Sequence, residues 1–329
     1  MKKVKTIQKG LNIIRSKNAI RYPDPEEDLP GYLAAYYSHP SWMVKRYLAR
    51  FGKDETEKLL AANNEKPFLT LKINALKTNP DEFKLLLNKV NLRYRHGRYL
   101  PEFFKLQNLT NITAWEYYAE GYFNIQDESA GLACRLLDVR PGMRVLDMCA
   151  APGGKTAYIA GLMHDEGEII AIDRFEARLR IMERNIKRLG INSINLVEKD
   201  ALEYTDSGFD RVLADVPCSG TGTLCKKPDV KWKKDLLDIR RMTQLQYQLL
   251  EKAASLVKPQ GVVVYSTCSI EPEENGDIIN KFLVAHPEFR LESAAGAFPG
   301  EIIDPDGCIQ TFPHSHQLDG AFAAKLVRI

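Results

Sequence analysis

The chain has 329 residues, of which 44% are hydrophobic and 27% charged, a composition typical of globular proteins and long enough for about two domains. No run approaches the roughly 18 apolar residues of a membrane-spanning helix, and the start lacks the apolar core of a signal peptide. Its 6 cysteines show no paired short spacings, which favours a reducing compartment over a disulfide framework. We therefore expect a cytoplasmic protein that makes no membrane contact.

Charge is distributed unevenly along the chain. Residues 1–125 carry 21 Lys and Arg against 13 Asp and Glu, whereas residues 126–329 carry 25 basic and 30 acidic residues. The first 21 residues alone hold 7 basic side chains and no acid. This asymmetry predicts a nucleic-acid-binding front part joined to a catalytic domain. For residues 1–20 taken alone, a solvated basic tail is the alternative.

The front part divides into short segments. We expect a basic stub and a Pro- and acid-rich linker over residues 1–28, and an N-terminal helical plus α+β RNA-binding module over residues 29–125. Apolar periodicity and alternation predict helices over 33–51, 55–63 and 80–90 and a strand over 68–74. A short αβ unit spanning about 66–122 follows from these elements.

Aromatic and basic residues interleave within that unit: Arg93, Tyr94, Arg95, Arg98, Tyr99, Phe103, Phe104 and Lys105. Stacking rings beside cationic groups are typical of proteins that bind single-stranded RNA. The alternative is that half of these aromatic residues belong to the hydrophobic core.

From Gln126 onward strands alternate with helices, which defines a catalytic domain over residues 126–329. Strands are predicted over 144–148, 168–173, 195–199, 211–215 and 261–266, with a last strand over 320–327 at the edge of the sheet. Helices are predicted over 155–163, 175–189, 234–257 and 273–286. The pattern is that of an α/β fold with a doubly wound, Rossmann-like parallel sheet, which binds ligands at the carboxyl ends of its strands.

A turn of small residues follows the first strand of this domain: Cys149, Ala150, Ala151, Pro152, Gly153, Gly154 and Lys155. Its glycines let backbone approach a ligand, and the helix that follows offers free N–H groups. The glycine spacing matches neither the dinucleotide fingerprint nor the P-loop.

Carboxylates end the next two strands. Asp173 can accept both hydroxyls of a ribose, and Asp200 could accept from an adenine amino group. A ribose and an adenine beside small glycines describe S-adenosylmethionine (SAM). Each acid taken alone is more often a helix cap or a solvated carboxylate.

Two cysteines stand in similar settings after later strands, Cys218 in Pro-Cys-Ser and Cys268 in Thr-Cys-Ser. Carbon 5 of cytosine becomes nucleophilic only after a thiolate adds to carbon 6, so paired thiols point to methylation of a pyrimidine carbon. The acid form of Asp215 could protonate ring nitrogen 3, and Lys155 could stabilise the thiolate. Cys134, Cys149 and Cys225 are more simply explained as small buried hydrophobic residues.

Other polar clusters carry weaker signals. Cys308, His314 and His316 lack the spacing of a zinc site, and we expect no metal. Five lysines crowd the segment after Cys218: Lys226, Lys227, Lys231, Lys233 and Lys234. We predict that these lysines bind phosphates in a salt-dependent manner. A solvated helix start is the alternative.

Residues 149–156, 215–222 and 265–269 resemble the signature motifs of the Nol/Nop/Sun family of RNA cytosine-5 methyltransferases. The likeness extends to 126–130, 227–232, 271–275 and 319–320 and covers about residues 29–329. It implies a SAM-dependent methyltransferase fold in which Cys268 is the nucleophile and Cys218 assists product release. It also implies that the SAM site is lined by the turn from Cys149 to Lys155 together with Asp173, Asp200 and Asp215.

Within the family, residues 29–33, 38–42 and 312–316 are most similar to the RsmB-like bacterial branch that acts on small-subunit (16S) rRNA. Chains of that branch usually begin with a helical domain similar to the antitermination factor NusB, which is either naturally absent or missing before Tyr22. The resemblance implies 16S rRNA as partner, with tRNA as an alternative substrate and a non-catalytic role in ribosome assembly as an alternative function. We expect a monomer.

Overall fold

The computed structural model describes residues 22–106 and 111–329. The chain divides into two compact units, Met1–Glu65 and Lys66–Ile329. The basic segment 1–21, for which we predict nucleic-acid binding, lies outside the described residues.

Two helices form the described part of the first unit, α2 (Leu29–Tyr36) and α3 (Ser41–Ala62). The Asp28 side chain starts α2 by accepting a hydrogen bond from the Gly31 N–H at 2.9 Å. The single helix predicted over 33–51 is wrong, because the chain leaves the helix before Pro40, which has no N–H and disfavours a helical residue before it. A non-helical Gly52, at φ 72°, then kinks α3.

A four-stranded antiparallel sheet in the order β2-β3-β1-β4 begins the second unit. Its elements are β1 (Leu69–Ile73), α4 (Pro80–Lys89), β2 (Tyr94–His96), β3 (Phe103–Leu106), α5 (Glu116–Ala119) and β4 (Phe123–Ile125). Asn79 caps α4 by accepting from the N–H groups of Asp81 and Glu82. The apolar face of α4 packs Phe83 against Phe104 in the core of this sheet. The strand and helix predicted over 68–74 and 80–90 are confirmed.

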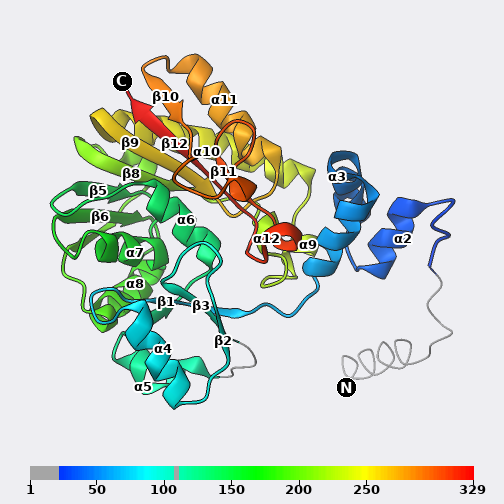
Figure 1. Cartoon of the computed structure of the whole chain (residues 1–329). Coiled ribbons are helices and arrows are strands. Elements are labelled where there is room, and N and C mark those ends of the chain that lie inside the picture. Colours follow the sequence, from blue (N-terminus) through cyan, green and yellow to red (C-terminus); the bar gives the residue numbers. More distant parts are fainter. Residues whose placement is uncertain (1–21, 107–110) are drawn as a thin grey trace, which may run out of the picture. The chain divides into compact units, whose positions relative to one another are not determined.

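The larger sheet has the order β10-β12-β9-β8-β5-β6-β7 and parallel pairing from β9 to β7. Its strands are β5 (Arg144–Asp147), β6 (Glu168–Asp173), β7 (Ile194–Glu198), β8 (Phe209–Asp215), β9 (Val257–Thr267), β10 (Phe289–Glu292) and β12 (Ala321–Arg328), and β11 (Ile309–Thr311) pairs with β12. The helices are α6 (Glu128–Leu136), α7 (Gly154–Leu162), α8 (Glu176–Leu189), α9 (Val230–Lys233), α10 (Leu236–Leu256), α11 (Gly276–Ala285) and α12 (Pro313–His316). The Rossmann-like α/β fold predicted from the sequence is confirmed (Figure 1).

The position of the last strand differs from the prediction. β12 does not close the sheet at its edge but lies between β9 and β10, antiparallel to both. Buried residues on both faces of β12, such as Phe322 and Ala323, explain this place, since an internal strand is covered on both sides. The edge is formed instead by β10.

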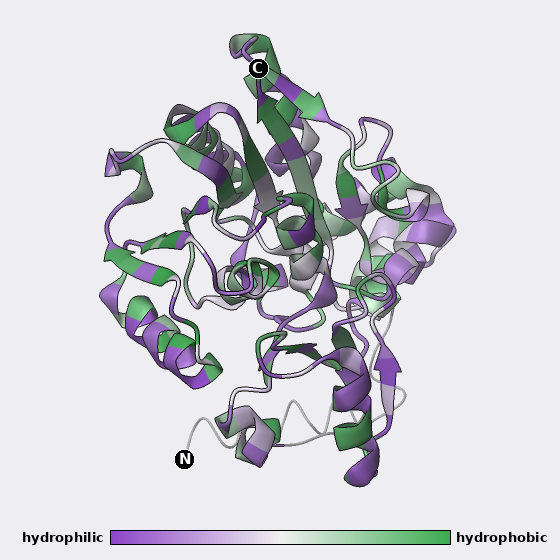
Figure 2. Ribbon diagram, turned by 60° about the vertical axis from the view of Figure 1, so that its left-hand side comes forward, coloured by the Kyte–Doolittle hydropathy of each residue, from purple (hydrophilic) through white to green (hydrophobic). Residues whose placement is uncertain are grey.

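Two apolar layers hold the larger sheet. One layer joins β8 and β9 to α10 and α11, and the other joins β5 and β6 to α6 and α7 on the opposite face. Figure 2 shows hydrophobic residues along the central strands, whereas the helices carry hydrophilic residues as well. Loops at the carboxyl ends of β5, β6, β8 and β9 therefore carry the polar residues that form the site.

Candidate active site

The loop between β5 and α7 has the geometry expected of a ligand-binding turn. Gly153 has φ 95°, and a Cβ atom at this position would lie 2.7 Å from the Met182 Cγ, so a side chain would be strained and would clash. α7 begins directly after Gly153 and its first turn has no side-chain cap. The N–H groups of that turn are thus available to an acceptor on a ligand.

Gln126 lies beside the same turn, and sequence reasoning assigned it no role. A Cβ atom on Gly154 would be 3.6 Å from the Gln126 amide carbon. Gln126 is 8% exposed, and neither atom of its amide has a hydrogen-bond partner among the described residues. Because an unpaired buried amide is costly, this site fits a polar ligand such as the amino-acid end of SAM. The signal in the sequence is the position of Gln126 at the start of the motif 126–130.

The two carboxylates predicted to bind the ribose and the adenine, Asp173 and Asp200, lie at the ends of β6 and β7, which are neighbouring parallel strands. Asp173 is buried and forms an ion pair with Arg178 at 2.9 Å. Arg178 also donates to the Ala151 carbonyl, so it joins the end of β6 to the cofactor loop. Asp200 is half-buried and caps the next turn by accepting from the Leu202 N–H at 3.0 Å, which is the alternative considered for it.

The two thiols meet directly. The Sγ atoms of Cys218 and Cys268 are 3.2 Å apart. The cysteines follow β8 and β9, which are adjacent parallel strands in which Asp215 pairs with Ser266, so both turns leave the sheet at the same level. The sequence predicted two thiols at strand ends, but the thiols touch only because β8 and β9 are adjacent in the sheet.

An ion pair stands beside the thiols. Lys155 Nζ, from the first turn of α7, lies 2.7 Å from Asp215 Oδ2, and the Ser266 hydroxyl donates to Asp215 Oδ1 at 2.8 Å. Both side chains are partly buried, at 19% and 28% exposure. The pair therefore places a cation and a carboxylate from two predicted motifs within one site.

The surroundings shift the pKa values of the two thiols in opposite directions. The hydrogen bond between the two sulfur atoms lowers the pKa of Cys268, and Lys155 and Lys227 act in the same direction, whereas burial and Asp215 oppose the shift. The same hydrogen bond raises the pKa of Cys218 well above its ordinary value, together with burial and the charges of Cys268 and Glu274. These opposite shifts favour the thiolate at Cys268 over one at Cys218.

A pocket of about 60 Å³ opens beside Cys268. Its lining residues are Asp127, Ser129, Ala130, Ala133, Lys155, Ser266, Thr267, Cys268, Asp319, Ala321 and Phe322. The nucleophile candidate and the ammonium of Lys155 thus face one small cavity of mixed polar and apolar character.

Lys226 links two carboxylates of the pocket wall. Its Nζ lies 2.5 Å from Asp127 Oδ2 and 2.8 Å from Asp319 Oδ2. Burial and the neighbouring Asp127 raise the pKa of Asp319 to about 7, although Lys226 opposes this shift. The predicted phosphate-binding role is wrong for Lys231, which is only 4% exposed. It stays a prediction for Lys226, which is exposed and pairs with these two carboxylates. Lys227 and Lys233 remain exposed.

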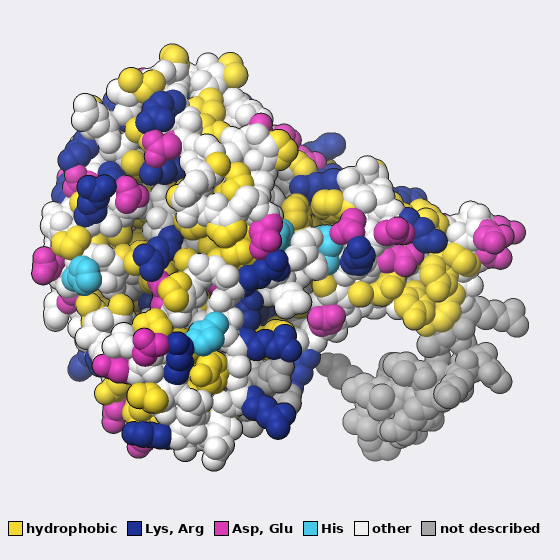
Figure 3. Space-filling model, viewed as in Figure 1, with side chains coloured by type: hydrophobic (Ala, Val, Ile, Leu, Met, Phe, Trp, Pro, Cys, Tyr) yellow, Lys and Arg dark blue, Asp and Glu magenta, His cyan; other side chains and the backbone are white. Residues whose placement is uncertain are grey.

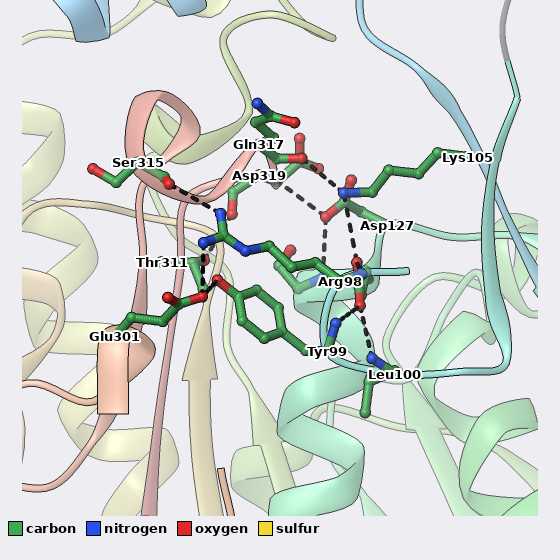
Figure 4. A network of polar contacts seen from close by, with 12 residues as sticks. Arg98, Tyr99, Leu100, Lys105, Asp127, Glu301, Thr311, Ser315, Gln317 and Asp319 are labelled. Atoms are coloured by element: carbon green, nitrogen blue, oxygen red, sulfur yellow. Dashed lines mark hydrogen bonds and ion pairs between the residues drawn. The ribbon is translucent and has the colours of Figure 1, made fainter. Parts of the chain in front are cut away.

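The small sheet contacts the same wall through the network in Figure 4. The buried Glu128 accepts hydrogen bonds from the backbone N–H groups of Arg98, Tyr99 and Leu100 at 3.0, 2.6 and 2.8 Å. Lys105 donates to the Gln317 carbonyl at 2.9 Å (Figure 4). Residues 98–105 therefore contact two parts of the catalytic domain: α6, through Glu128, and the loop that contains Gln317 and Asp319.

Several residues of the predicted RNA-binding cluster have structural roles instead. Phe103 and Phe104 are fully buried and Lys105 is 6% exposed, which confirms the alternative considered for the aromatic residues. Arg93, directly before β2, and Arg95, within β2, are exposed. Figure 3 shows Lys and Arg side chains gathered on the side of the second unit that carries β2 in Figure 1.

The remaining cysteines stay outside the thiol pair. Cys134 and Cys308 are buried, Cys149 and Cys225 are half-buried, and burial raises the pKa of all four thiols. Over residues 22–106 and 111–329 the structure contains no group of three His, Cys, Asp or Glu side chains that could hold a metal ion. In the same part of the chain, every helix is too short or too polar to cross a membrane.

Comparisons with known proteins agree with this geometry. Residues 134–327 match the family described as 16S rRNA methyltransferase RsmB/F, and residues 39–113 match a ferredoxin-like domain of RsmF/B-like methyltransferases. A probable ribosomal RNA small subunit methyltransferase B from Synechocystis is 38% identical over 97% of this chain and 74% of its own length. The protein of the same description from Bacillus subtilis is 34% identical over 92% of this chain and 69% of its own.

Solved structures show the same fold. A methyltransferase homologue from Pyrococcus horikoshii superposes with a TM-score of 0.80 and 29% identity, over 90% of this chain and 98% of that one. NSun6 from the same organism, solved with the SAM analogue SFG, has a TM-score of 0.77 and 25% identity, over 86% of this chain and 97% of its own. With a cofactor loop that fits SAM, the chain therefore belongs to the RsmB/F family of 16S rRNA methyltransferases and is a SAM-dependent RNA methyltransferase.

Proposed function

We propose that this enzyme methylates carbon 5 of a cytosine in small-subunit rRNA, with Cys268 as nucleophile and Cys218 as the thiol that assists product release. The observation that carries the proposal is the 3.2 Å contact between the two sulfur atoms beside the Lys155–Asp215 ion pair. Methylation of an oxygen or a basic nitrogen needs no thiol, whereas carbon 5 of cytosine does. The names of the Synechocystis and Bacillus relatives support small-subunit rRNA as the substrate.

The reaction starts with the Cys268 thiolate. Its sulfur forms a bond to carbon 6, and the electron pair of the ring double bond moves toward carbon 5 while nitrogen 3 takes a proton held by the Lys155–Asp215 pair. SAM supplies the electrophilic methyl group that carbon 5 then accepts. The loop 149–155, Gln126, Asp173 and Asp200 are the residues we propose to hold the cofactor.

Release reverses the addition. Carbon 5 loses its proton to solvent, the ring double bond re-forms, and the bond between carbon 6 and the Cys268 sulfur breaks. Nitrogen 3 returns its proton to the Lys155–Asp215 pair. The sulfur leaves as the Cys268 thiolate from which the reaction began, and the Cys218 thiol, 3.2 Å away, is placed to stabilise this leaving thiolate by donating a hydrogen bond to it while keeping its own proton.

Tritium transfer from methyl-labelled SAM to small-subunit rRNA tests the proposal. We expect Cys268→Ala to be inactive and free of adduct, because it has no sulfur to add to carbon 6. Cys218→Ala should accumulate a covalent protein–RNA complex on a denaturing gel, because release is impaired. Cys308→Ala removes a buried thiol outside the pair and serves as the matched control. Methylation by Cys268→Ala, or label outside 5-methylcytosine, would contradict the assignment, and label transferred only to tRNA would change the substrate.

A further inference from the structure

Glu274 lies beneath both cysteine-bearing turns with its side chain fully buried. It belongs to the short 3-10 turn Pro272–Glu274 that follows β9. Its Oε1 accepts hydrogen bonds from the Ser219 N–H at 2.8 Å and from Gln246 Nε2 at 2.9 Å. Its Oε2 accepts from the Ser269 hydroxyl at 2.5 Å and from the Ser219 hydroxyl.

These contacts join the two turns through one carboxylate. Ser219 directly follows Cys218, and Ser269 directly follows Cys268. Glu274 therefore adds to the direct contacts between the turns, in which the Ser219 and Ser269 hydroxyls lie 3.2 Å apart and the Gly222 N–H donates to the Cys268 carbonyl at 3.0 Å. Together these contacts fix the position of one turn relative to the other, and with it the 3.2 Å distance between the sulfur atoms. The four donors are neutral groups, so they satisfy the carboxylate oxygens without supplying a counter-charge.

The charges around the two thiols are unequal. Cys218 is influenced by the carboxylate of Glu274, by Cys268 itself and by the neighbouring Tyr265 phenol, whose hydroxyl donates to the Glu274 carbonyl at 2.6 Å. Cys268 is influenced by Asp215 and by two cations, Lys155 and Lys227. A negative charge near Cys218 disfavours its thiolate, whereas the cations near Cys268 favour one there.

We propose that Glu274 is a positioning residue that holds the two cysteine turns in contact and keeps Cys218 as the neutral thiol, so that Cys268 alone carries the charge. The proposal rests on the two-thiol function given above and adds a residue outside both cysteine motifs. Its consequence is a fixed direction for the sulfur–sulfur hydrogen bond, from Cys218 to Cys268.

Alkylation of each thiol by iodoacetamide as a function of pH tests the proposal without RNA. In this reaction the thiolate forms a bond to carbon and iodide leaves, so the rate reports the thiolate fraction. Peptide mass spectrometry on full-length Cys268→Ser and Cys218→Ser chains isolates one thiol at a time. Adding Glu274→Gln should speed alkylation of Cys218 at pH 8 about tenfold, the effect of one pKa unit. Glu273→Gln removes the same charge one residue away and should leave the Cys218 rate unchanged.

A second variant separates geometry from charge. Ser219→Ala with Ser269→Ala keeps the Glu274 charge but removes both hydroxyl contacts, and should lower kcat for methyl transfer with KM unchanged while Cys218 stays slow to alkylate. Equal alkylation profiles with and without the Glu274 carboxylate, or an unaltered kcat in the double serine variant, would overturn the proposal. If Glu274→Gln no longer melts cooperatively, the kcat and the Cys218 alkylation rate of the double serine variant test the proposal instead. Failure of the proposed function would appear separately, as methylation by Cys268→Ala.

Discussion

Lys155 connects three features of the site: the cofactor loop in which it lies, Asp215 at 2.7 Å, and Cys268, whose pKa its charge lowers. It is also among the residues that line the pocket. A group with these contacts is placed to act both on the thiolate and on the proton needed by ring nitrogen 3. The effect of Lys155 on the Cys268 thiolate can therefore be measured from the pH dependence of the rate.

We expect Lys155→Met to lower methyl transfer about a hundredfold, as is typical for loss of a charged group that assists proton transfer. In the proposed reaction activity needs the Cys268 thiolate, so we expect the rate to rise with pH until the pKa of Cys268 is passed. Because the Lys155 ammonium lowers that pKa, its removal should move the rising limb to higher pH. The measurement is kcat against pH for wild type and variant.

Lys155→Arg keeps the positive charge and is the matched control for that profile. Its rising limb should stay near the wild-type position even if the rate falls, since Arg does not reproduce the Lys contact with Asp215. A Lys155→Met profile with an unshifted limb would show that the ammonium does not act on Cys268.

At the scale of elements, the small sheet and the catalytic domain meet through α6. Glu128, at the start of α6, is fully buried and satisfies three backbone N–H groups of the segment before β3. Lys105 of β3 lies 3.5 Å from the same carboxylate. One carboxylate thus fixes the segment that contacts the C-terminal loop bearing Asp319 (Figure 4).

Glu128→Ala should destabilise the protein by about 3 kcal/mol, because it leaves three backbone N–H groups without their acceptor and removes the counter-charge of the buried Lys105. Glu301→Ala is the control, since Glu301 binds Arg98 at 2.8 Å from an exposed position where ion pairs contribute little. Urea denaturation of both variants checks the difference. Equal losses would mean that the Glu128 contacts do not stabilise the fold.

At the scale of the whole molecule, every residue proposed for SAM or catalysis lies within the unit Lys66–Ile329. The match to the ferredoxin-like family domain, residues 39–113, begins before this unit and ends inside it. The domain boundaries predicted from the sequence, at residues 28 and 125, stay a prediction. We propose that residues 66–329 form the unit that binds SAM.

A fragment of residues 66–329 should melt cooperatively and bind SAM within about threefold of the full chain, because its core and its cofactor loop are internal to it. Calorimetric titration with SAM and a thermal melt check this. Its affinity for RNA should fall, since it lacks the basic segment 1–21. A fragment that fails to melt cooperatively would show that residues 1–65 belong to the folding unit.

Much of the fold and the chemistry could be predicted from local patterns. The alternation of strands and helices after Gln126 determined the sheet, because apolar periodicity within a segment reports its own secondary structure. The loop 149–155 and the two cysteine motifs were recognisable because their residue types stand in fixed order. The edge position of the last strand was wrong because strand order depends on pairing between segments distant in sequence.

The sequence by itself determined which groups this protein carries: a glycine turn that fits SAM, Lys155, Asp215 and two thiols. Only the tertiary structure decided how they act together. Because β8 and β9 are adjacent, Cys218 and Cys268 lie 3.2 Å apart, and Glu274 reaches both of their turns. Asp127 and Asp319 engage Lys226 in ion pairs, and burial leaves the Gln126 amide unpaired among the described residues. Distances, burial and charge balance arise from packing between distant segments, which no pattern within one segment records.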